Sequence, residues 1–406
     1  MTNSSNSILI PVDRLEPGMY VSDLDRPWLE SPFMFQGFTV HTADEIAEVQ
    51  RICRHVYIDA NRHTERKKIS QEPRPARISA REQRIQREQL RKSARSYQSA
   101  HHLVKDMMDD IRLGGSLDVP QIKEAVSECV DRVIQHEAAM TLLTRLKNRD
   151  EYTSQHSLNV AILAIALGRH LGMDRKQLEK LGECGMLHDI GKVKTPLEVL
   201  NKPGRLTPDE FQVMKRHPTE GRNILMGYSG LTSGAMSVAH SHHERLDGTG
   251  YPRGLTRDQT TPYTKIVSVV DAYDAITSER IYKPGLTSLQ GLKILHDSKD
   301  THFEKTYVMK FIQSIGLYPV GSMVQLNSGE IGIVTRILSE RQKTRPQVLI
   351  VRNAQKQPVE PFFVNLLNDD RAPNGHTYRI ATMLKNSEYQ ADIRQYLDQP
   401  TEKKSA

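Results

Sequence analysis

The spacing of apolar residues changes twice along this chain, and the two changes limit the folds that it can adopt. Between about Leu103 and Gly316, apolar residues recur every three or four positions, as they do in amphipathic helices. Before residue 60 and after Pro319, the apolar runs are short, rich in β-branched residues and separated by turn residues, which is typical of strands. The sequence therefore predicts a mainly α protein, with an all-helical central domain between a small, partly β amino-terminal domain and a small β appendage.

The length of 406 residues is more than one typical core supports, so we expect several domains. An accessory domain over residues 1–63 precedes a basic helical linker over residues 64–100. The helical domain covers residues 101–318, and residues 319–406 form the β appendage and a polar tail. Strands are expected near residues 8–12, 19–21, 56–59, 323–326, 331–334 and 348–351.

The net charge of +7 is concentrated in the linker. From Thr64 to Arg95 there are eleven Lys or Arg and four Glu, which accounts for the whole excess. With Pro73 and Pro75 inside it, such a run is more often a solvated linker or charged helix than a phosphate-binding arm. Because the run contains no aromatic residue for base stacking, we do not expect nucleic acid as a partner.

No segment resembles a membrane anchor or a disulfide framework. The apolar run Val160 to Leu167 is far shorter than the roughly 20 residues of a spanning helix, and the polar start is no signal peptide. Cys53, Cys129 and Cys184 are widely scattered, without the paired spacing of a zinc ribbon. We therefore expect a cytoplasmic protein that has no membrane partner.

Histidine and aspartate occupy positions in the helical region where apolar side chains are expected. His156 shares a helix face with Val160, Leu163 and Leu167, and the pair His188-Asp189 continues another apolar stripe. Asp271 follows the apolar run from Ile266 to Val270. A buried carboxylate without compensation costs several kcal/mol or shifts its pKa strongly, and metal coordination removes that cost.

Three more histidines complete the candidate set: His217, His242 and His243. Seven nitrogen and oxygen donors exceed the needs of one tetrahedral zinc, so we expect a two-metal centre. Imidazole with carboxylate suits iron, manganese, nickel, cobalt or zinc better than calcium or magnesium. A single histidine on an apolar face is usually a hydrogen-bonded core residue, so this interpretation depends on the whole set.

The order of these motifs resembles the signature of the HD-GYP phosphodiesterases, a branch of the HD-domain phosphohydrolases. The resemblance extends from Arg149 to Gly316, and the stretch from Arg14 to Val21 resembles an accessory domain that often precedes HD-GYP domains. The matching motifs are His156, His188-Asp189-Ile190-Gly191-Lys192, His217-Pro218, His242-His243-Glu244, Asp247-Gly248-Thr249-Gly250-Tyr251-Pro252 and Asp271-Ala272-Tyr273-Asp274-Ala275.

The resemblance implies an all-α domain that binds two or three divalent metals, commonly iron or manganese. Asp189 would bridge two of them. A glutamate that accompanies a third metal in some members is replaced here by Tyr152, with Glu151 one place away, so we expect two. The metal ligands that the resemblance implies are His156, His188, Asp189, His217, His242, His243 and Asp271.

The resemblance further implies hydrolysis of cyclic di-GMP to linear pGpG, with GMP as a further product left open. A hydroxide shared by two divalent ions would attack the phosphodiester. His188, Asp189 and Lys192 would be catalytic, and Lys192 would also grip a substrate phosphate. The implied substrate contacts are Lys192, Gly250, Tyr251, Pro252, Asp274, Arg280 and Lys283.

Two alternatives stay open. The chain could be an HD-type hydrolase of another cyclic dinucleotide, such as cyclic GMP-AMP, or a receptor that binds the nucleotide without cutting it. The accessory domain could engage regulatory or signalling proteins, and the sequence leaves homo-oligomerisation open.

Overall fold

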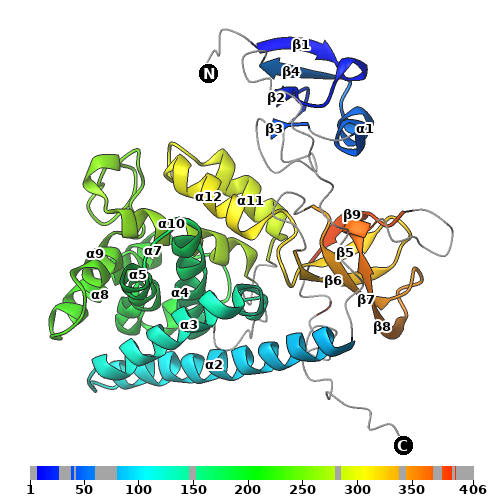
Figure 1. The fold of residues 1–406 in the computed structure, drawn as a ribbon. Coiled ribbons are helices and arrows are strands. Elements are labelled where there is room, and N and C mark those ends of the chain that lie inside the picture. The colour runs from blue at the N-terminus through cyan, green and yellow to red at the C-terminus, as the bar shows by residue number, and fades with distance from the viewer. Residues whose placement is uncertain are drawn as a thin grey trace, which may run out of the picture.

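The computed structural model describes residues 7–26, 38–40, 43–59, 80–145, 152–278, 285–337, 344–368, 377–385 and 389. A small sheet, a helical body and a second sheet follow one another along the chain (Figure 1). The mainly α fold that the sequence predicts is confirmed. No helix in the described ranges is long and apolar enough to cross a bilayer.

Among the described residues, the amino-terminal part is a four-stranded antiparallel sheet with one α-helix. The strand order is β1-β4-β2-β3, and three of the strands lie where the sequence predicts them. The helix α1 was not expected, because the short amphipathic run is hidden between strand signals. The linker residues 64–79 lie outside the described residues. The elements are β1 (Ser7–Pro11), β2 (Tyr20–Leu24), β3 (Phe38–Thr39), α1 (Ala43–Ile52) and β4 (His55–Asp59).

The helical body contains eleven α-helices among the described residues. Its first helix, α2, runs without a break across the domain boundary expected at residues 100/101, and it lies along the whole body in Figure 1. The helices are α2 (Ala80–Arg112), α3 (Val119–Leu143), α4 (Tyr152–His170), α5 (Arg175–Leu187), α6 (Leu197–Leu200), α7 (Pro208–Met214), α8 (His217–Met226), α9 (Ser233–Ser241), α10 (Pro262–Thr277), α11 (Ser288–Asp297) and α12 (Lys305–Ile315).

Short polar side chains fix where many of these helices begin. In each case the side chain before the helix accepts a hydrogen bond from a backbone N–H of the first turn, which would otherwise lack a partner. Proline follows the capping residue closely in α3, α7 and α10. The capping residues are Asp118, Asp174, Thr207, Thr232, Thr261 and Thr287.

The helix α4 is the centre of the body. Val160 and Leu163 on one side belong to an apolar cluster with α10 and α12, while Ala161 and Ile165 on the other side join a cluster with α2, α3 and α5. A helix that is apolar all round is a buried helix. Its approach to α5 requires glycine, because a Cβ on Gly185 would lie 2.7 Å from the Ala161 Cα.

The carboxy-terminal part is a five-stranded antiparallel sheet with strand order β8-β7-β6-β5-β9. The three predicted strands are confirmed as β5, β6 and β7. Val320 and Met323 share an apolar cluster with Leu90 of α2 and Leu142 of α3, so the sheet packs on the helical body. The strands are β5 (Met323–Leu326), β6 (Ile331–Arg336), β7 (Gln347–Arg352), β8 (Pro358–Asn365) and β9 (Ile380–Leu384).

Candidate metal centre

All seven predicted ligands converge inside the helical body. They form two groups, and within each group one potential ligand atom per residue lies within 4.8 Å of the others. Five of the seven stand at or near a helix end, where the packing of α4, α5, α8, α9 and α10 brings distant segments together. The first group is His156, His188 and Asp271, and the second is Asp189, His217, His242 and His243.

The Asp189 carboxylate lies between the two groups and turns one oxygen toward each. Its Oδ1 is 3.3 Å from His217 Nε2 and 3.6 Å from His242 Nε2. Its Oδ2 is 3.3 Å from His188 Nε2 and 3.7 Å from His156 Nε2. This is the arrangement that a carboxylate bridging two ions would need.

Backbone carbonyls orient three of the imidazoles. The Nδ1–H of His188 donates to Gly185 O at 2.8 Å, and that of His217 donates to Met214 O at 2.7 Å. The Nδ1–H of His242 is shared between two carbonyls of α9 at 3.1 Å. Because a carbonyl can only accept, Nδ1 carries a proton in each ring, and Nε2 of each ring points into the centre.

Several buried atoms of the centre lack an ordinary partner, which is what residues built to hold a cation would show. His188 Nε2 and Asp189 Oδ1 are buried and make no hydrogen bond of normal geometry in the described part of the chain. The Nε2 atoms of His217 and His242 face each other at 3.2 Å. Two lone pairs at that distance repel unless a cation or a proton lies between them, so the donor set fits divalent metal.

The ionisation of these groups follows from burial and mutual contact. Burial lowers the pKa of His217 to about 3, despite the nearby Asp189 carboxylate, so the ring is neutral and available as a ligand. Burial opposes ionisation of Asp189, but Lys192 and His188 outweigh it and hold its pKa well below the usual range. Neutral imidazole and ionised carboxylate are the forms that bind metal.

His156 is held by two carboxylates, one on each side of its ring. Its Nε2 lies 3.0 Å from Asp271 Oδ1, and its Nδ1 lies 2.8 Å from Asp274 Oδ2. Burial lowers the pKa of His156, but these hydrogen bonds outweigh it and raise the value to about 9. A metal ligand whose second ring nitrogen is bonded to a carboxylate is a common arrangement in metalloproteins.

The expectation that Asp274 contacts the substrate is therefore corrected. Its side chain is buried behind His156, on the side away from Asp271. Its Oδ1 accepts a bond from Asn159 Nδ2 at 3.3 Å, and Oδ2 accepts bonds from His156 and Ser278. These protein contacts occupy the oxygens that a base edge would need, so Asp274 orients His156 instead.

Lys192 extends toward the centre from the 3-10 helix η4 (Ile190–Lys194). Its Nζ lies 2.5 Å from Asp189 Oδ2 and its side chain is 17% exposed, so the ammonium group is at the edge of the buried cluster. The backbone before it needs Gly191, because a Cβ there would lie 1.9 Å from His217 O. Glycine at this point lets η4 pack against α8 and brings Asp189 to His217.

The segment from Asp247 to Thr256 is a loop, as its glycines and proline predict. A Cβ on Gly250 would lie 2.4 Å from Arg245 N, so only glycine fits. The buried Glu244 carboxylate fixes the far end of the loop: it accepts the N–H groups of Arg253 at 2.8 Å and Leu255 at 2.9 Å. Glu244 follows the His242-His243 pair directly, so the loop is tied to two of the predicted ligands.

The Tyr251 ring stacks on His243, with ring centroids 4.7 Å apart. Its next neighbours come from α7, which the sequence did not indicate. Phe211 meets the Tyr251 ring edge to face at 6.3 Å, and Lys215 Nζ lies 5.2 Å from the Phe211 centroid and 5.9 Å from that of Tyr251. An aromatic pair with a cation above it suits a nucleotide, which carries both a π face and a phosphate.

Three sequence expectations fall where the structure gives no information. Arg280 and Lys283, predicted as substrate contacts, lie outside the described residues. The same holds for Glu151 and for the side chain of Tyr152, on which the number of metals depended. Pro252, the last residue of the motif that begins at Asp247, is described, and it is exposed beside Tyr251.

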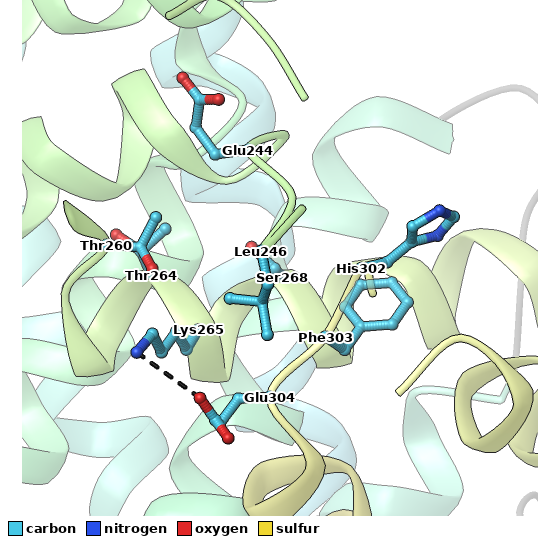
Figure 2. A pocket seen from close by; sticks show the side chains of 9 residues that line it. All are labelled: Glu244, Leu246, Thr260, Thr264, Lys265, Ser268, His302, Phe303 and Glu304. Carbon is cyan, nitrogen blue, oxygen red and sulfur yellow. Dashed lines mark ion pairs between the residues drawn. The ribbon is translucent and has the colours of Figure 1, made fainter. Parts of the chain in front are cut away.

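Glu244 also lines a small hollow, which lies between α10 and the start of α12. Figure 2 shows its lining, in which Lys265 and Glu304 form an ion pair at 3.6 Å. Ser268 in this lining donates to His242 O at 2.7 Å, so the hollow is the supporting layer behind the histidine pair. None of the seven ligands lines it.

Family models match the amino-terminal part and the helical body. A model described as an HD domain matches residues 135–307, and one described as a domain of unknown function, DUF3391, matches residues 7–122. The first match contains all seven converging residues.

Known relatives cover the chain to different extents. A cyclic di-GMP phosphodiesterase of Pseudomonas aeruginosa, PA4108, is 35% identical over 375 residues, which are 88% of each chain. A 3′3′-cGAMP-specific phosphodiesterase of Vibrio cholerae is 36% identical over 39% of this chain and 36% of its own length. A solved structure, Bd1817 of Bdellovibrio bacteriovorus, described as an HDG"Y"P protein, aligns with a TM-score of 0.47 at 16% identity over 75% of this chain and 98% of that chain.

Proposed function

This chain belongs to the HD-GYP family of HD-domain phosphodiesterases, and on that premise we propose that it hydrolyses cyclic di-GMP to linear pGpG. The observation that carries the proposal is the position of Asp189, whose two oxygens face two separate groups of imidazoles. The relative with 88% coverage of both chains supports the choice of cyclic di-GMP as substrate. Whether a second cut releases GMP is part of the test.

We propose that the two groups each hold one divalent ion, with Asp189 shared. Bound ions would supply Lewis acidity, which ionises water near neutral pH and neutralises phosphate charge. The mixed imidazole and carboxylate donors favour iron or manganese, with nickel, cobalt or zinc as alternatives. A third ion is not part of the proposal.

The chain's own residues would bind and orient the substrate. The Lys192 ammonium, at the edge of the cluster, would exchange its contact with Asp189 for a substrate phosphate. Gly250, Tyr251 and Pro252 would form one wall of the pocket, with Tyr251 against a guanine. Arg280 and Lys283 complete the proposed contacts, and His188 with Asp189 would act at the reacting phosphate.

The division of labour along the chain is also proposed. Residues 101–318 would carry the chemistry. Residues 64–100 would connect this domain to residues 1–63, and residues 319–406 would support the helical body. Residues 1–63 would receive a regulatory or signalling partner.

Cyclic GMP-AMP is the second candidate substrate. The Vibrio cholerae relative named for that nucleotide matches part of this chain at an identity close to that of PA4108. Both nucleotides therefore belong in the same experiment.

The test is incubation of anaerobically purified, metal-loaded protein with each nucleotide, followed by chromatography of the products. We expect a linear dinucleotide from cyclic di-GMP, and none from Asp189→Ala. Asp131→Ala is the matched control, because Asp131 is a partly exposed aspartate on α3 that pairs with Arg175 and belongs to neither group of the centre. Intact nucleotide retained on the protein would instead identify a receptor, and turnover by Asp189→Ala would mean that the chemistry lies elsewhere.

A further inference from the structure

The long helix α2 reaches the metal centre at two places, and neither belongs to the seven ligands. Tyr97 approaches from the middle of the helix and Arg112 from its last turn. Both side chains end in hydrogen bonds to the layer directly behind the ligands. Figure 1 shows how α2 underlies the body from the carboxy-terminal sheet to the start of α3.

A buried chain of hydrogen bonds connects Tyr97 to His156. The Tyr97 hydroxyl donates to Asn159 Oδ1 at 2.8 Å, and Asn159 Nδ2 donates to Asp274 Oδ1 at 3.3 Å. The other oxygen of Asp274 accepts from His156 Nδ1 at 2.8 Å. Every member is less than a tenth exposed. Asn159 Nδ2 also donates to Thr144 O at 3.1 Å, so the Tyr97 hydroxyl and this carbonyl together fix the amide with its NH₂ toward the carboxylate, which in turn orients the imidazole.

Arg112 holds the backbone that carries Lys192. Its Nη2 donates to Lys192 O at 3.2 Å and its Nη1 donates to Thr195 O at 3.3 Å. Lys192 O also accepts the N–H of Thr195, the residue that follows η4, at 3.0 Å, so Arg112 holds the two carbonyls that frame the end of this helix. The planar guanidinium can span two carbonyls that a lysine ammonium could not hold in the same fixed geometry.

We propose that α2 positions both halves of the centre, with Tyr97 acting through His156 and Arg112 acting through Lys192. The inference rests on the proposed function, because it takes His156 as a metal ligand and Lys192 as a phosphate contact. Tyr97 and Arg112 are positioning residues and touch neither metal nor substrate. Their loss should therefore give two different defects, one in metal retention and one in substrate binding.

For Tyr97, the experiment is chelator competition on the full-length, manganese-loaded protein. Tyr97→Phe keeps the ring in the core and removes only the hydroxyl. We expect half of the bound manganese to be lost at a chelator concentration about fivefold lower than in the wild type, since one net hydrogen bond has roughly that value. Tyr378→Phe is the control, because it removes a partly buried hydroxyl that bonds to Glu330, the residue before β6. Identical retention in Tyr97→Phe and the wild type, at equal thermal stability, would overturn this half of the proposal.

For Arg112, the experiment is steady-state kinetics with cyclic di-GMP. We expect Arg112→Ala to raise KM about fivefold or more with manganese content unchanged, and Arg112→Lys to recover part of the loss. Arg95→Ala, an exposed arginine on the same helix, should leave KM unchanged. An unchanged KM in Arg112→Ala would contradict the assignment. A fall in kcat alone, explained by a smaller fraction of folded protein, would contradict it as well.

Two readouts separate this inference from the proposed function. Manganese retention needs no substrate, and amide hydrogen exchange over residues 190–195 reports the hold of Arg112 on η4. If the wild-type protein leaves cyclic di-GMP intact, the proposed function fails. Both readouts would still show whether α2 positions the residues of the centre. Faster exchange in Arg112→Ala than in Arg95→Ala supports the inference, and equal exchange contradicts it.

Discussion

Gly191 illustrates how a single residue without a functional group can control the centre. Its Cα lies against α8, where a Cβ would be 1.9 Å from His217 O and 2.4 Å from Gly221 N. We predict that Gly191→Ala lowers the free energy of unfolding by about 3 kcal/mol, at the upper end for overpacking, because the obstacle is backbone. The displacement of α8 should also lower manganese content, measured by elemental analysis beside the melting temperature.

Gly227→Ala at the end of α8 is the control for this substitution. Its Cβ would meet one carbonyl at 3.3 Å, which a small shift can relieve. A Gly191→Ala protein that keeps its full metal content would show that the spacing of η4 and α8 does not matter for the ligands.

The metal-free centre should have a characteristic pH dependence. The folded pKa of His156 is raised to about 9 from an ordinary 6.5, so its stabilising contribution is fully present below pH 6.5 and is lost as the pH rises to about 9. Burial lowers the pKa of His217 to about 3, so its contribution is lost as the pH falls from 6.5 to 3. We predict maximum stability near pH 6.5 to 7 and a loss on the order of 3 kcal/mol by pH 9.

Urea denaturation of the chelator-treated protein at pH 7 and pH 9 measures this loss. The manganese-loaded protein is the control, because His156 cannot then carry its second ring proton and the fall should be smaller. A metal-free protein as stable at pH 9 as at pH 7 would mean that the His156 ring is not held between Asp271 and Asp274.

The sequence was sufficient to predict the seven residues that converge and insufficient for the residues behind them. His156 and Asp271 stand out because a charged or polar group interrupts an apolar stripe, and their motifs fall in a recognisable order. Tyr97 and Asn159 give no such signal, since a tyrosine or asparagine in a helix has many ordinary reasons to be there. Their role depends on which helices pack together, which periodicity does not specify.

At the scale of elements, the loop from Asp247 to Thr256 is stabilised by a charge rather than by apolar packing. The Glu244 carboxylate accepts two backbone N–H groups of the loop, and hydrogen bonds to a charged group contribute about 1.5–3 kcal/mol each. We predict that Glu244→Gln, which turns one acceptor into a donor, raises KM for cyclic di-GMP about tenfold or more.

Kinetics with metal analysis would check this prediction, since manganese content should not change. Glu179→Gln is the comparison, because Glu179 pairs with Arg175 on an exposed surface. Loss of metal in Glu244→Gln would show instead that the carboxylate supports His242 and His243 directly.

Among the elements, the sequence predicted helices and central strands well. Strands β5 to β7 are short β-branched runs bounded by turn residues, and that signal is local. The continuity of α2 across residues 100/101 was not foreseen, because the change from basic to apolar composition looked like a boundary. In fact the basic residues and the buried Tyr97 and Ala100 belong to one helix with two environments.

At the scale of the whole molecule, the carboxy-terminal sheet and the helical body share a core. Leu142 of α3 lies in one apolar cluster with Leu90 of α2 and Met323 of β5, so a cavity there removes contacts from both parts. Leu366, by contrast, belongs to a second cluster formed by the sheet and its flanking residues alone. Two leucine truncations can therefore separate coupling between the parts from stability of the sheet itself.

We predict that Leu142→Ala and Leu366→Ala each lower the free energy of unfolding by about 2–5 kcal/mol, but that they affect different parts of the molecule. Leu142→Ala should accelerate amide hydrogen exchange in β6 and also in α10, which carries Asp271, because the sheet braces α2 and α3 against the helices of the centre. Leu366→Ala should accelerate exchange in the sheet and leave α10 protected. If Leu142→Ala also left amide exchange in α10 unchanged, the sheet would not stabilise the helices of the centre. In that case α2 would hold the centre without support from the sheet.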